Sequence, residues 1–211
     1  MRDPFHRIVR IPTAILSDAL GRLGTMSAAI KPVAKGMRLT GIAHTVRCYP
    51  GDYLTLLKAL AEATEGEVLV VDGGGMLEAA LLGRMMVLEA RRKDIQGFVI
   101  DGAVRDLRDL EEVGVPVFTR AATPRVGTAE HLRETQVPII CGGASVQPGD
   151  IVHGDEDGVV VFSPKKLRAV ATRALEIQRH EAEVVRKLRR GRPLAELVKL
   201  LDRLVELRKR G

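Results

Sequence analysis

The sequence has no tryptophan, and only 3% of its residues are aromatic. It also contains no apolar run near the ~18 residues of a membrane span, and its opening residues, MRDPFHRIVRIP, hold no apolar signal core. We therefore expect a cytoplasmic protein without a membrane segment. Asparagine is absent as well, and 24 arginines stand against 9 lysines. This fits a thermophile source, although genome composition would give the same arginine bias.

Cysteine is scarce too, since Cys48 and Cys141 are the only thiols and have no CxxC spacing. Disulfide or metal roles are therefore disfavoured, and buried, inert thiols are the expectation. No two histidines stand at the i, i+4 spacing of metal ligands. All five are interpreted as surface or structural residues: His6, His44, His131, His153 and His180.

With 211 residues, of which 45% are hydrophobic, the chain predicts a single domain spanning residues 1–211. Its core should cover about residues 11–163, followed by C-terminal helices over about 164–211. The first part carries 18 basic and 21 acidic side chains, and the second carries 15 and 6. Nucleic-acid binding is disfavoured because aromatics are few and no known motif is present. A solvated or intersubunit helix face is the preferred interpretation of the basic tail.

The centre of the chain, residues 71–112, predicts two strand-to-helix turns opening on the same edge of a sheet. The first turn is Gly73-Gly74-Gly75, after which Leu77, Leu81, Met85 and Leu88 recur at helical spacing. Glycines allow close backbone approach, and free amides at a helix start attract anions. This turn predicts a carboxylate or phosphate site.

The second turn, residues 101–106, presents Arg105 beside Asp106. A rigid planar cation here stands next to an oxygen ligand that suits a hard metal ion such as Mg²⁺, so the first turn would hold the anion and this one the metal. The alternative is that this pair is a plain surface salt bridge.

The remaining elements follow in order along the chain. Residues 11–23 predict a helix, in which Asp18 is either a capping residue or part of a pocket. Residues 41–49 predict a strand, and Asp52 is the expected N-cap of a helix that Gly66 ends.

After the central stretch, residues 113–119 predict a helix end and a strand, and residues 121–127 predict a rim loop. Two strand regions are expected at 137–146 and 150–162. The acidic turn at 154–158 lacks the spacing of an EF-hand and is interpreted as a tight polar turn.

Ser163-Pro164 predicts the start of a helix that runs to Gly191, and a second helix follows Pro193. The apolar stripe of this second helix favours contact with another subunit. It consists of Leu194, Leu197, Val198, Leu201, Leu204 and Val205.

Several motifs together resemble the RraA-like family, which includes the regulator of ribonuclease activity A and the divalent-metal 4-hydroxy-4-methyl-2-oxoglutarate aldolases. They are the DGGG loop, the step from Ala80 to Gly83, and VIDGAVRD followed by Asp109. Further matches are LSDAL at 16–20, PGD at 50–52, AATP at 121–124, and PGD with GDEDGVVV between 148 and 161. The resemblance implies an α/β swivelling β/β/α sandwich with a C-terminal helical extension, assembled as a homotrimer or hexamer.

The resemblance also implies roles for individual residues. Asp106 would hold Mg²⁺ or Mn²⁺, and Arg105 would be catalytic, polarising the keto oxygen of a small 2-oxo acid. The carboxylate would be gripped by the turn at Gly74 and Gly75 and by the amides of Met76 and Leu77.

The chain departs from the aldolases at Arg84, where they carry an acidic residue. Because arginine stays protonated, it cannot act as the base that aldol cleavage requires. Arg84 would instead contact a more anionic substrate, and any base would come from Glu78 or from Glu181 or Glu183 of a neighbouring subunit. The expected function is a metal-dependent lyase that forms a pyruvate enolate, with oxaloacetate decarboxylation favoured over aldol cleavage. The alternative is a non-enzymatic regulator that binds ribonuclease or the RNA-degradation machinery.

Overall fold

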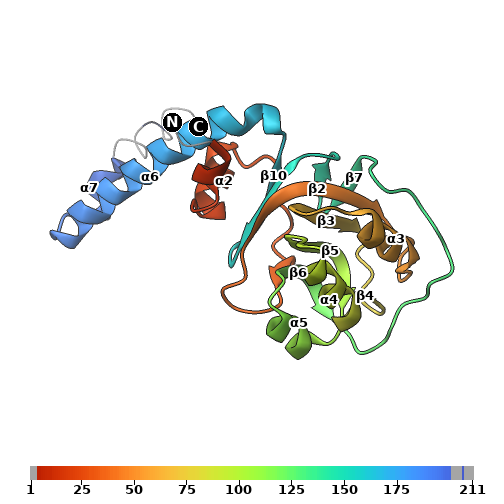
Figure 1. Ribbon diagram of the computed structural model, residues 1–211. Coiled ribbons are helices and arrows are strands. Elements are labelled where there is room, and N and C mark those ends of the chain that lie inside the picture. Colours follow the sequence, from red (N-terminus) through yellow and green to blue (C-terminus); the bar gives the residue numbers. More distant parts are fainter. Residues whose placement is uncertain (1–3, 201–205, 207–211) are drawn as a thin grey trace.

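The computed structural model describes residues 4–200 and 206, which form a mixed α/β fold around one nearly closed, barrel-like sheet (Figure 1). The sheet has eight strands in the order β1-β6-β5-β3-β2-β9-β10, with β4 beside β5. They are β1 (Lys31–Pro32), β2 (Leu39–Arg47), β3 (Glu67–Asp72), β4 (Ala80–Leu82), β5 (Gly97–Val104), β6 (Val117–Ala122), β9 (Ile151–Asp155) and β10 (Gly158–Phe162). The two edges meet where Lys31 Nζ donates to the carbonyl of Asp157, at 2.6 Å.

The central strands β2, β3, β5 and β6 are parallel, and both of their faces are covered. Val68 and Val70 of β3 pack into one core cluster, whereas Leu69 and Val71 pack into another. This explains why β3 is a continuous apolar run instead of an alternating one. The fold agrees with the α/β class that the sequence predicted and with the β/β/α sandwich that the family resemblance implied.

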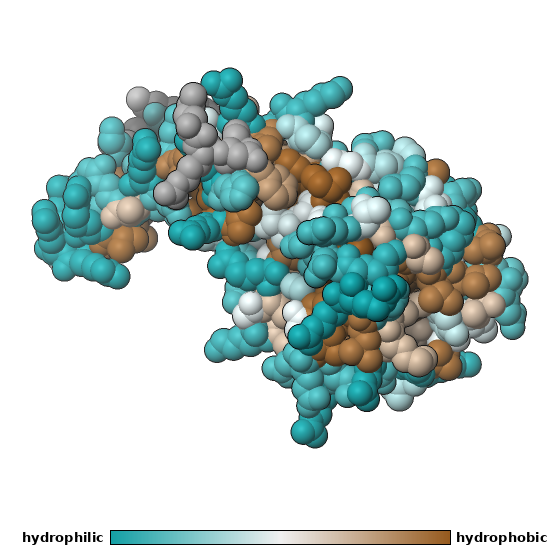
Figure 2. Space-filling view, viewed as in Figure 1, coloured by the Kyte–Doolittle hydropathy of each residue, from teal (hydrophilic) through white to brown (hydrophobic). Residues whose placement is uncertain are grey.

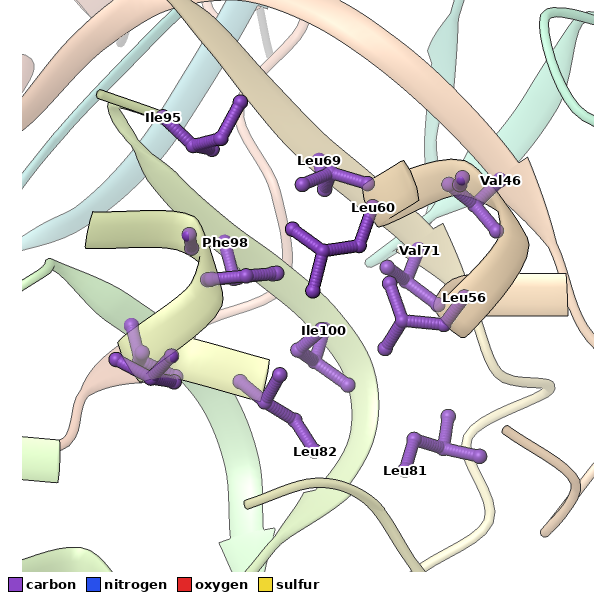
Figure 3. Packing of buried hydrophobic residues seen from close by; sticks show 14 of the residues in the cluster. Val46, Leu56, Leu60, Leu69, Val71, Leu81, Leu82, Ile95, Phe98 and Ile100 are labelled. Atoms are coloured by element: carbon purple, nitrogen blue, oxygen red, sulfur yellow. The ribbon is translucent and has the colours of Figure 1, made fainter. Parts of the chain in front are cut away.

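Three helices cover the outer face of these strands: α3 (Leu54–Glu62), α4 (Arg84–Arg92) and α5 (Leu107–Val113). Figure 3 shows Leu56 and Leu60 of α3 packing towards Leu69, Val71, Phe98 and Ile100 of the sheet. The other face is covered by a hairpin of β7 (Ile139–Cys141) and β8 (Ala144–Val146). The helices α1 (Pro4–Ile8) and α2 (Thr13–Ala19) pack in a third cluster with β9 and β10.

The C-terminal region begins as predicted, because the Ser163 side chain accepts a hydrogen bond from the Lys165 amide in the 3₁₀ turn η1 (Pro164–Lys166). Helix α6 (Leu167–Arg189) then packs its first half on α2 through Val170, Ala171 and Ala174. Its second half extends away from the sheet, with α7 (Leu194–Leu197) at the far end (Figure 1). Positions 201, 204 and 205 of the predicted apolar stripe lie outside the described residues.

The prediction for the central stretch was wrong in one respect. The three glycines do not open a helix, because Ala80–Leu82 forms β4 against β5 and the helix begins only at Arg84. Strand β5 also continues through Asp101 and Gly102 to Val104, beyond the predicted turn. Pairing between strands therefore overrode the helical spacing of Leu77 and Leu81.

Other predicted elements differ mainly at their ends, and α3 stops at Glu62, before the predicted Gly66. The sequence did not predict α1 or β1. The first predicted helix stops at Ala19 instead of residue 23, because Gly21, Arg22 and Gly24 adopt positive φ angles. Gly114 ends α5 in the left-handed conformation, as predicted, and the following strand runs to Ala122. Across the described residues, none of the helices combines the length and hydropathy that crossing a bilayer requires.

Candidate functional site

A cavity of about 350 Å³ opens between α3 and α4, beside the end of β5. Its charged lining residues are Arg84, Glu89, Arg105 and Asp106. Apolar and aromatic side chains form the other walls: Tyr53, Leu57 and Leu60 near and on α3, Met85 and Met86 on α4, and Val126 from the loop that follows β6. The cavity therefore brings together Arg84, Arg105 and Asp106, three of the residues that the sequence predicted.

Asp106 is held in an unusual backbone conformation at the start of α5. Its φ angle is +61°, a left-handed value that aspartate tolerates better than most residues. This conformation turns the carboxylate back to α4, where Oδ2 accepts a hydrogen bond from the Arg84 amide at 3.0 Å. The guanidinium Nε of Arg105 lies 3.6 Å from the same oxygen. One carboxylate thus joins the start of α4 to the end of β5.

Gly83 leaves the space in which this arrangement fits. A Cβ atom at position 83 would lie 2.7 Å from Asp106 Oδ2 and 3.1 Å from both Cγ and Nε of Arg105. Its backbone, with φ −150° and ψ −174°, is extended and does not require glycine. Glycine is therefore needed here for room and not for backbone freedom.

The sequence predicted anion-binding amides in the glycine loop, but the unpaired helix amides beside the cavity belong to the start of α4. The first-turn amides of Met85 and Met86 have no i−4 carbonyl within the helix, and both residues line the cavity. Together with Arg84 and Arg105, they make this end of the cavity suited to an anion.

The glycine loop lies outside the residues that line this cavity. The Gly74 amide donates to Asp72 Oδ1 at 3.1 Å, and the Gly75 amide donates to the Asp101 carbonyl at 3.1 Å. The Met76 amide also has an internal acceptor, the Gly73 carbonyl at 3.4 Å. These amides would have to break internal hydrogen bonds to bind a substrate, while Leu77 is exposed on the same loop.

Arg84 is half exposed, and its Nη1 lies 3.7 Å from Oδ1 of Asp109. This loose pairing leaves the guanidinium able to turn towards a ligand. A second hollow, of about 310 Å³, is lined by Ala122, Thr123 and Pro124 together with Arg105 and Asp106. The predicted rim loop therefore borders the site.

The sequence interpretation missed Glu89 and Tyr53, which also line the cavity. Glu89 is bonded by Arg92, whose Nε and Nη2 donate to its two oxygens at 2.8 and 2.6 Å. This hydrogen bonding lowers the pKa of the Glu89 carboxyl and makes it a weaker base. The i, i+3 spacing of Glu89 and Arg92 could have predicted the pair, but not its place beside the cavity.

The other acidic candidates lie elsewhere. Glu78 is exposed on the loop before β4. Glu181 and Glu183 lie on the extended half of α6, where Glu183 pairs with Lys187 at 2.8 Å. Asp18 is exposed on α2 and does not line the cavity.

The N-cap position of α3 is Tyr53 and not Asp52 as predicted, and Asp52 has a wider structural role. Its Oδ1 accepts from the Leu54 amide at 2.9 Å, and its Oδ2 accepts from the hydroxyl of Thr128 and the amides of Glu130 and His131. Burial opposes ionisation, but hydrogen bonds from the Leu54 and Glu130 amides outweigh it and hold the pKa at about 2. A permanent carboxylate thus ties down the loop that carries Val126 to the cavity.

Other predicted structural residues are buried. Desolvation raises the pKa of the Cys48 thiol to about 12 and also raises that of Cys141, so neither forms a reactive thiolate. Asp155 accepts from the amide and hydroxyl of Thr13 and from the Asp157 amide, consistent with a tight turn.

A metal ion at this site would depend on few protein ligands. Within residues 4–200 and at 206, no three His, Cys, Asp or Glu side chains gather as a metal site. Asp106 nevertheless offers a carboxylate, about one third exposed, at the cavity. Mg²⁺ commonly binds through one or two carboxylates and keeps several waters or substrate oxygens, so this donor set fits it.

Comparisons with known proteins identify relatives of this chain. A family model described as RraA-like, Aldolase/RraA, matches residues 13–161. A relative from Halalkalibacterium halodurans, provisionally named 4-hydroxy-4-methyl-2-oxoglutarate aldolase, is 40% identical over 72% of this chain and 72% of its own. A Thermus thermophilus relative with the same aldolase name is 36% identical over 71% of this chain and 91% of its own.

A solved Thermus thermophilus structure, described as the RNA-processing inhibitor RraA, superposes with a TM-score of 0.66. It is 36% identical and covers 72% of this chain and 92% of its own. Proteins similar to this chain therefore carry both an enzyme name and a regulator name.

Proposed function

We propose a lyase function from the premise that this chain belongs to the RraA-like family, whose model matches residues 13–161. Relatives named as aldolases, at 36% and 40% identity, support carbon–carbon bond cleavage. The reaction that we propose is metal-dependent cleavage of a 2-oxo acid through a pyruvate enolate, with oxaloacetate decarboxylation favoured. The observation that carries this proposal is the joining of Arg105, Asp106 and the start of α4 at one cavity.

In this proposal the substrate carboxylate binds at the start of α4. The amides of Met85 and Met86 receive it, with Arg84 close by, because the Gly74, Gly75 and Met76 amides already have internal acceptors. Leu77 and the glycine loop would then border the site instead of gripping the carboxylate.

Arg105 would stabilise the charge that develops on the keto oxygen. Its guanidinium is held beside Asp106 before any substrate arrives, so little reorganisation accompanies the reaction. Mg²⁺ or Mn²⁺ bound at Asp106 would add Lewis-acid polarisation of the same oxygen. In decarboxylation of oxaloacetate, the bond between C3 and C4 breaks and C4 leaves as CO₂. The electron pair of that bond stays with C3 and is delocalised onto the C2 carbonyl oxygen, which forms the enolate.

Aldol cleavage needs a further group that accepts the proton of the 4-hydroxyl. Arg84 cannot accept it, and Glu89, whose pKa is lowered by Arg92, is a poor acceptor. Decarboxylation of oxaloacetate has no such requirement. We therefore expect measurable decarboxylation and much weaker cleavage of 4-hydroxy-4-methyl-2-oxoglutarate.

The test compares kcat/KM for the two substrates on one preparation loaded with Mg²⁺ or Mn²⁺, after subtracting the rate with the metal alone. Arg105→Lys should lower decarboxylation by about 10²-fold or more, since it removes a preorganised planar donor. Arg108→Lys, at an exposed arginine on α5 that pairs with Glu112, is the matched control and should retain the rate. An unchanged rate in Arg105→Lys would remove Arg105 from the reaction.

A second candidate function is regulation of RNA processing, because the similar Thermus structure is described as an RNA-processing inhibitor. Absence of decarboxylation with both metals, together with inhibition of RNA cleavage by a ribonuclease, would favour it. Efficient aldol cleavage would instead show that another group, such as Glu78 or Glu181 or Glu183 of a neighbouring subunit, acts as the base.

A further inference from the structure

The cavity continues beyond Arg105 and Asp106 along a wall that is mostly apolar. Tyr53, Leu57 and Leu60 form its α3 side, Met85 and Met86 face it from α4, and Val126 borders it. Several of these side chains are not part of the buried core, since Leu57 is 45% exposed and Met85 is 77% exposed. Figure 2 shows apolar residues gathered on the side of the molecule where Figure 1 places α3 and α4.

We propose that this wall binds an apolar alkyl or aryl group carried on C3 of the 2-oxo acid substrate. The inference rests on the proposed function, because Arg105 and the start of α4 define where the acid end lies. The apolar group then extends along α3, away from the two guanidinium groups.

The size of the cavity supports a substrate larger than pyruvate. A volume of about 350 Å³ falls within the range of sites that enclose most of a small organic ligand. A pyruvate unit bound at Arg105 and Met85 would leave much of the α3 wall uncovered. Filling that wall with apolar carbon removes water from both surfaces and so tightens binding.

The charges argue against a second carboxylate along this wall. Among the side chains that line the cavity, the charged residue other than Arg84, Arg105 and Asp106 is Glu89, which is negative and already engaged by Arg92. A substrate carboxylate there would lose water without gaining a cationic partner, so the C4 carboxylate of oxaloacetate would have to lie at the acid end, near Arg84. A neutral apolar group meets no such cost.

Calorimetry on the full chain with saturating Mg²⁺ tests the ligand class without turnover. The three probes are pyruvate, 2-oxo-4-phenylbutanoate and 2-oxoglutarate, which share the acid end and differ in its extension. We expect the phenyl compound to bind at least about tenfold more tightly than pyruvate, and 2-oxoglutarate to gain no such affinity. Equal affinity for pyruvate and the phenyl compound, or tightest binding of 2-oxoglutarate, would overturn the proposal.

Two leucine variants locate the effect. Leu57→Gln places an amide on the cavity wall and should reduce the preference for the phenyl compound by about 3- to 10-fold. Leu88→Gln is the matched control, because Leu88 is 44% exposed on α4 but does not line the cavity. Equal effects of the two substitutions would refute the assignment of the wall.

Light scattering on the same variants separates this proposal from an intersubunit role. If Leu57→Gln lowers the molecular mass and leaves the affinities unchanged, α3 contacts a second copy and the proposal is wrong. Lyase activity and ligand preference test the two proposals separately. Preference for the phenyl compound without any lyase activity would reject the proposed function but support the proposed ligand class. Lyase activity without the preference would do the opposite.

Discussion

The substitution Gly83→Ala tests most directly how the site is assembled. The added Cβ would lie 2.7 Å from Asp106 Oδ2, closer than such contacts normally permit, and 3.1 Å from Arg105 Cγ and Nε. Both neighbours are side chains, so they can move away at small cost in folding free energy. Gly83 is also the N-cap of α4, a position where glycine is favoured over alanine. We therefore expect the substitution to lower the free energy of unfolding by about 1 kcal/mol in total.

The effect on activity should be much larger than the effect on stability. Displacing Asp106 breaks its hydrogen bond with the Arg84 amide and moves both the proposed metal ligand and Arg105. A shift of about 1 Å in reacting groups can cost roughly 10²-fold in rate. Gly83→Ala should therefore lower decarboxylation by about that factor and weaken Mg²⁺ binding measured by calorimetry.

Gly36→Ala is the control, because it should lower stability to a similar extent without affecting the site. Gly36 has a φ angle of +83° and open space around its Cβ position, so alanine there should cost about 1 kcal/mol through backbone strain alone. Thermal or urea unfolding would measure both stabilities, and steady-state kinetics both rates. If Gly83→Ala retains the full rate, or if Gly36→Ala loses as much activity, the packing of Gly83 against Asp106 does not control the site.

The remaining predictions concern the metal, the oligomer and pH. Asp106→Ala should abolish Mg²⁺ binding in calorimetry with little change in the unfolding midpoint, and unchanged binding would reject the metal assignment. Truncation after Gly191 should lower the mass seen by light scattering, whereas an unchanged mass would assign the apolar stripe to its own subunit. His153 donates from Nε2 to the Ile11 carbonyl at 3.0 Å and accepts at Nδ1 from the Thr40 hydroxyl at 2.7 Å, and burial lowers its pKa from 6.5 to about 4. Because the unfolded chain binds the proton more readily, neutral His153 contributes its full stability above pH 6.5, and this contribution is lost as pH falls towards 4. Urea unfolding at a series of pH values would show the loss as a fall in the free energy of unfolding between pH 6.5 and 4. His153→Gln should make that fall less steep.

The amino-acid sequence alone predicted the fold class and the main pair of candidate site residues. The apolar run before Asp72, the capping pattern at Ser163-Pro164 and the glycine stop at Gly114 are local signals, and each predicted an element that the structure contains. Arg105 and Asp106 are adjacent in the chain, so their proximity needed no tertiary information. The family motifs extended this local interpretation to the β/β/α sandwich.

Tertiary structure alone decided where the proposed anion-binding end of the candidate site lies. The spacing of Leu77 and Leu81 predicted a helix after the glycines, but hydrogen bonds between Ala80–Leu82 and β5 made that segment a strand and moved the helix start to Arg84. The placement of Glu89 and Val126 beside Arg105 likewise depends on the packing of α4 and on the loop that Asp52 holds. Contacts of this kind join residues far apart in the chain, and no local periodicity encodes them, because strand pairing is stabilised by partners that the segment itself does not contain.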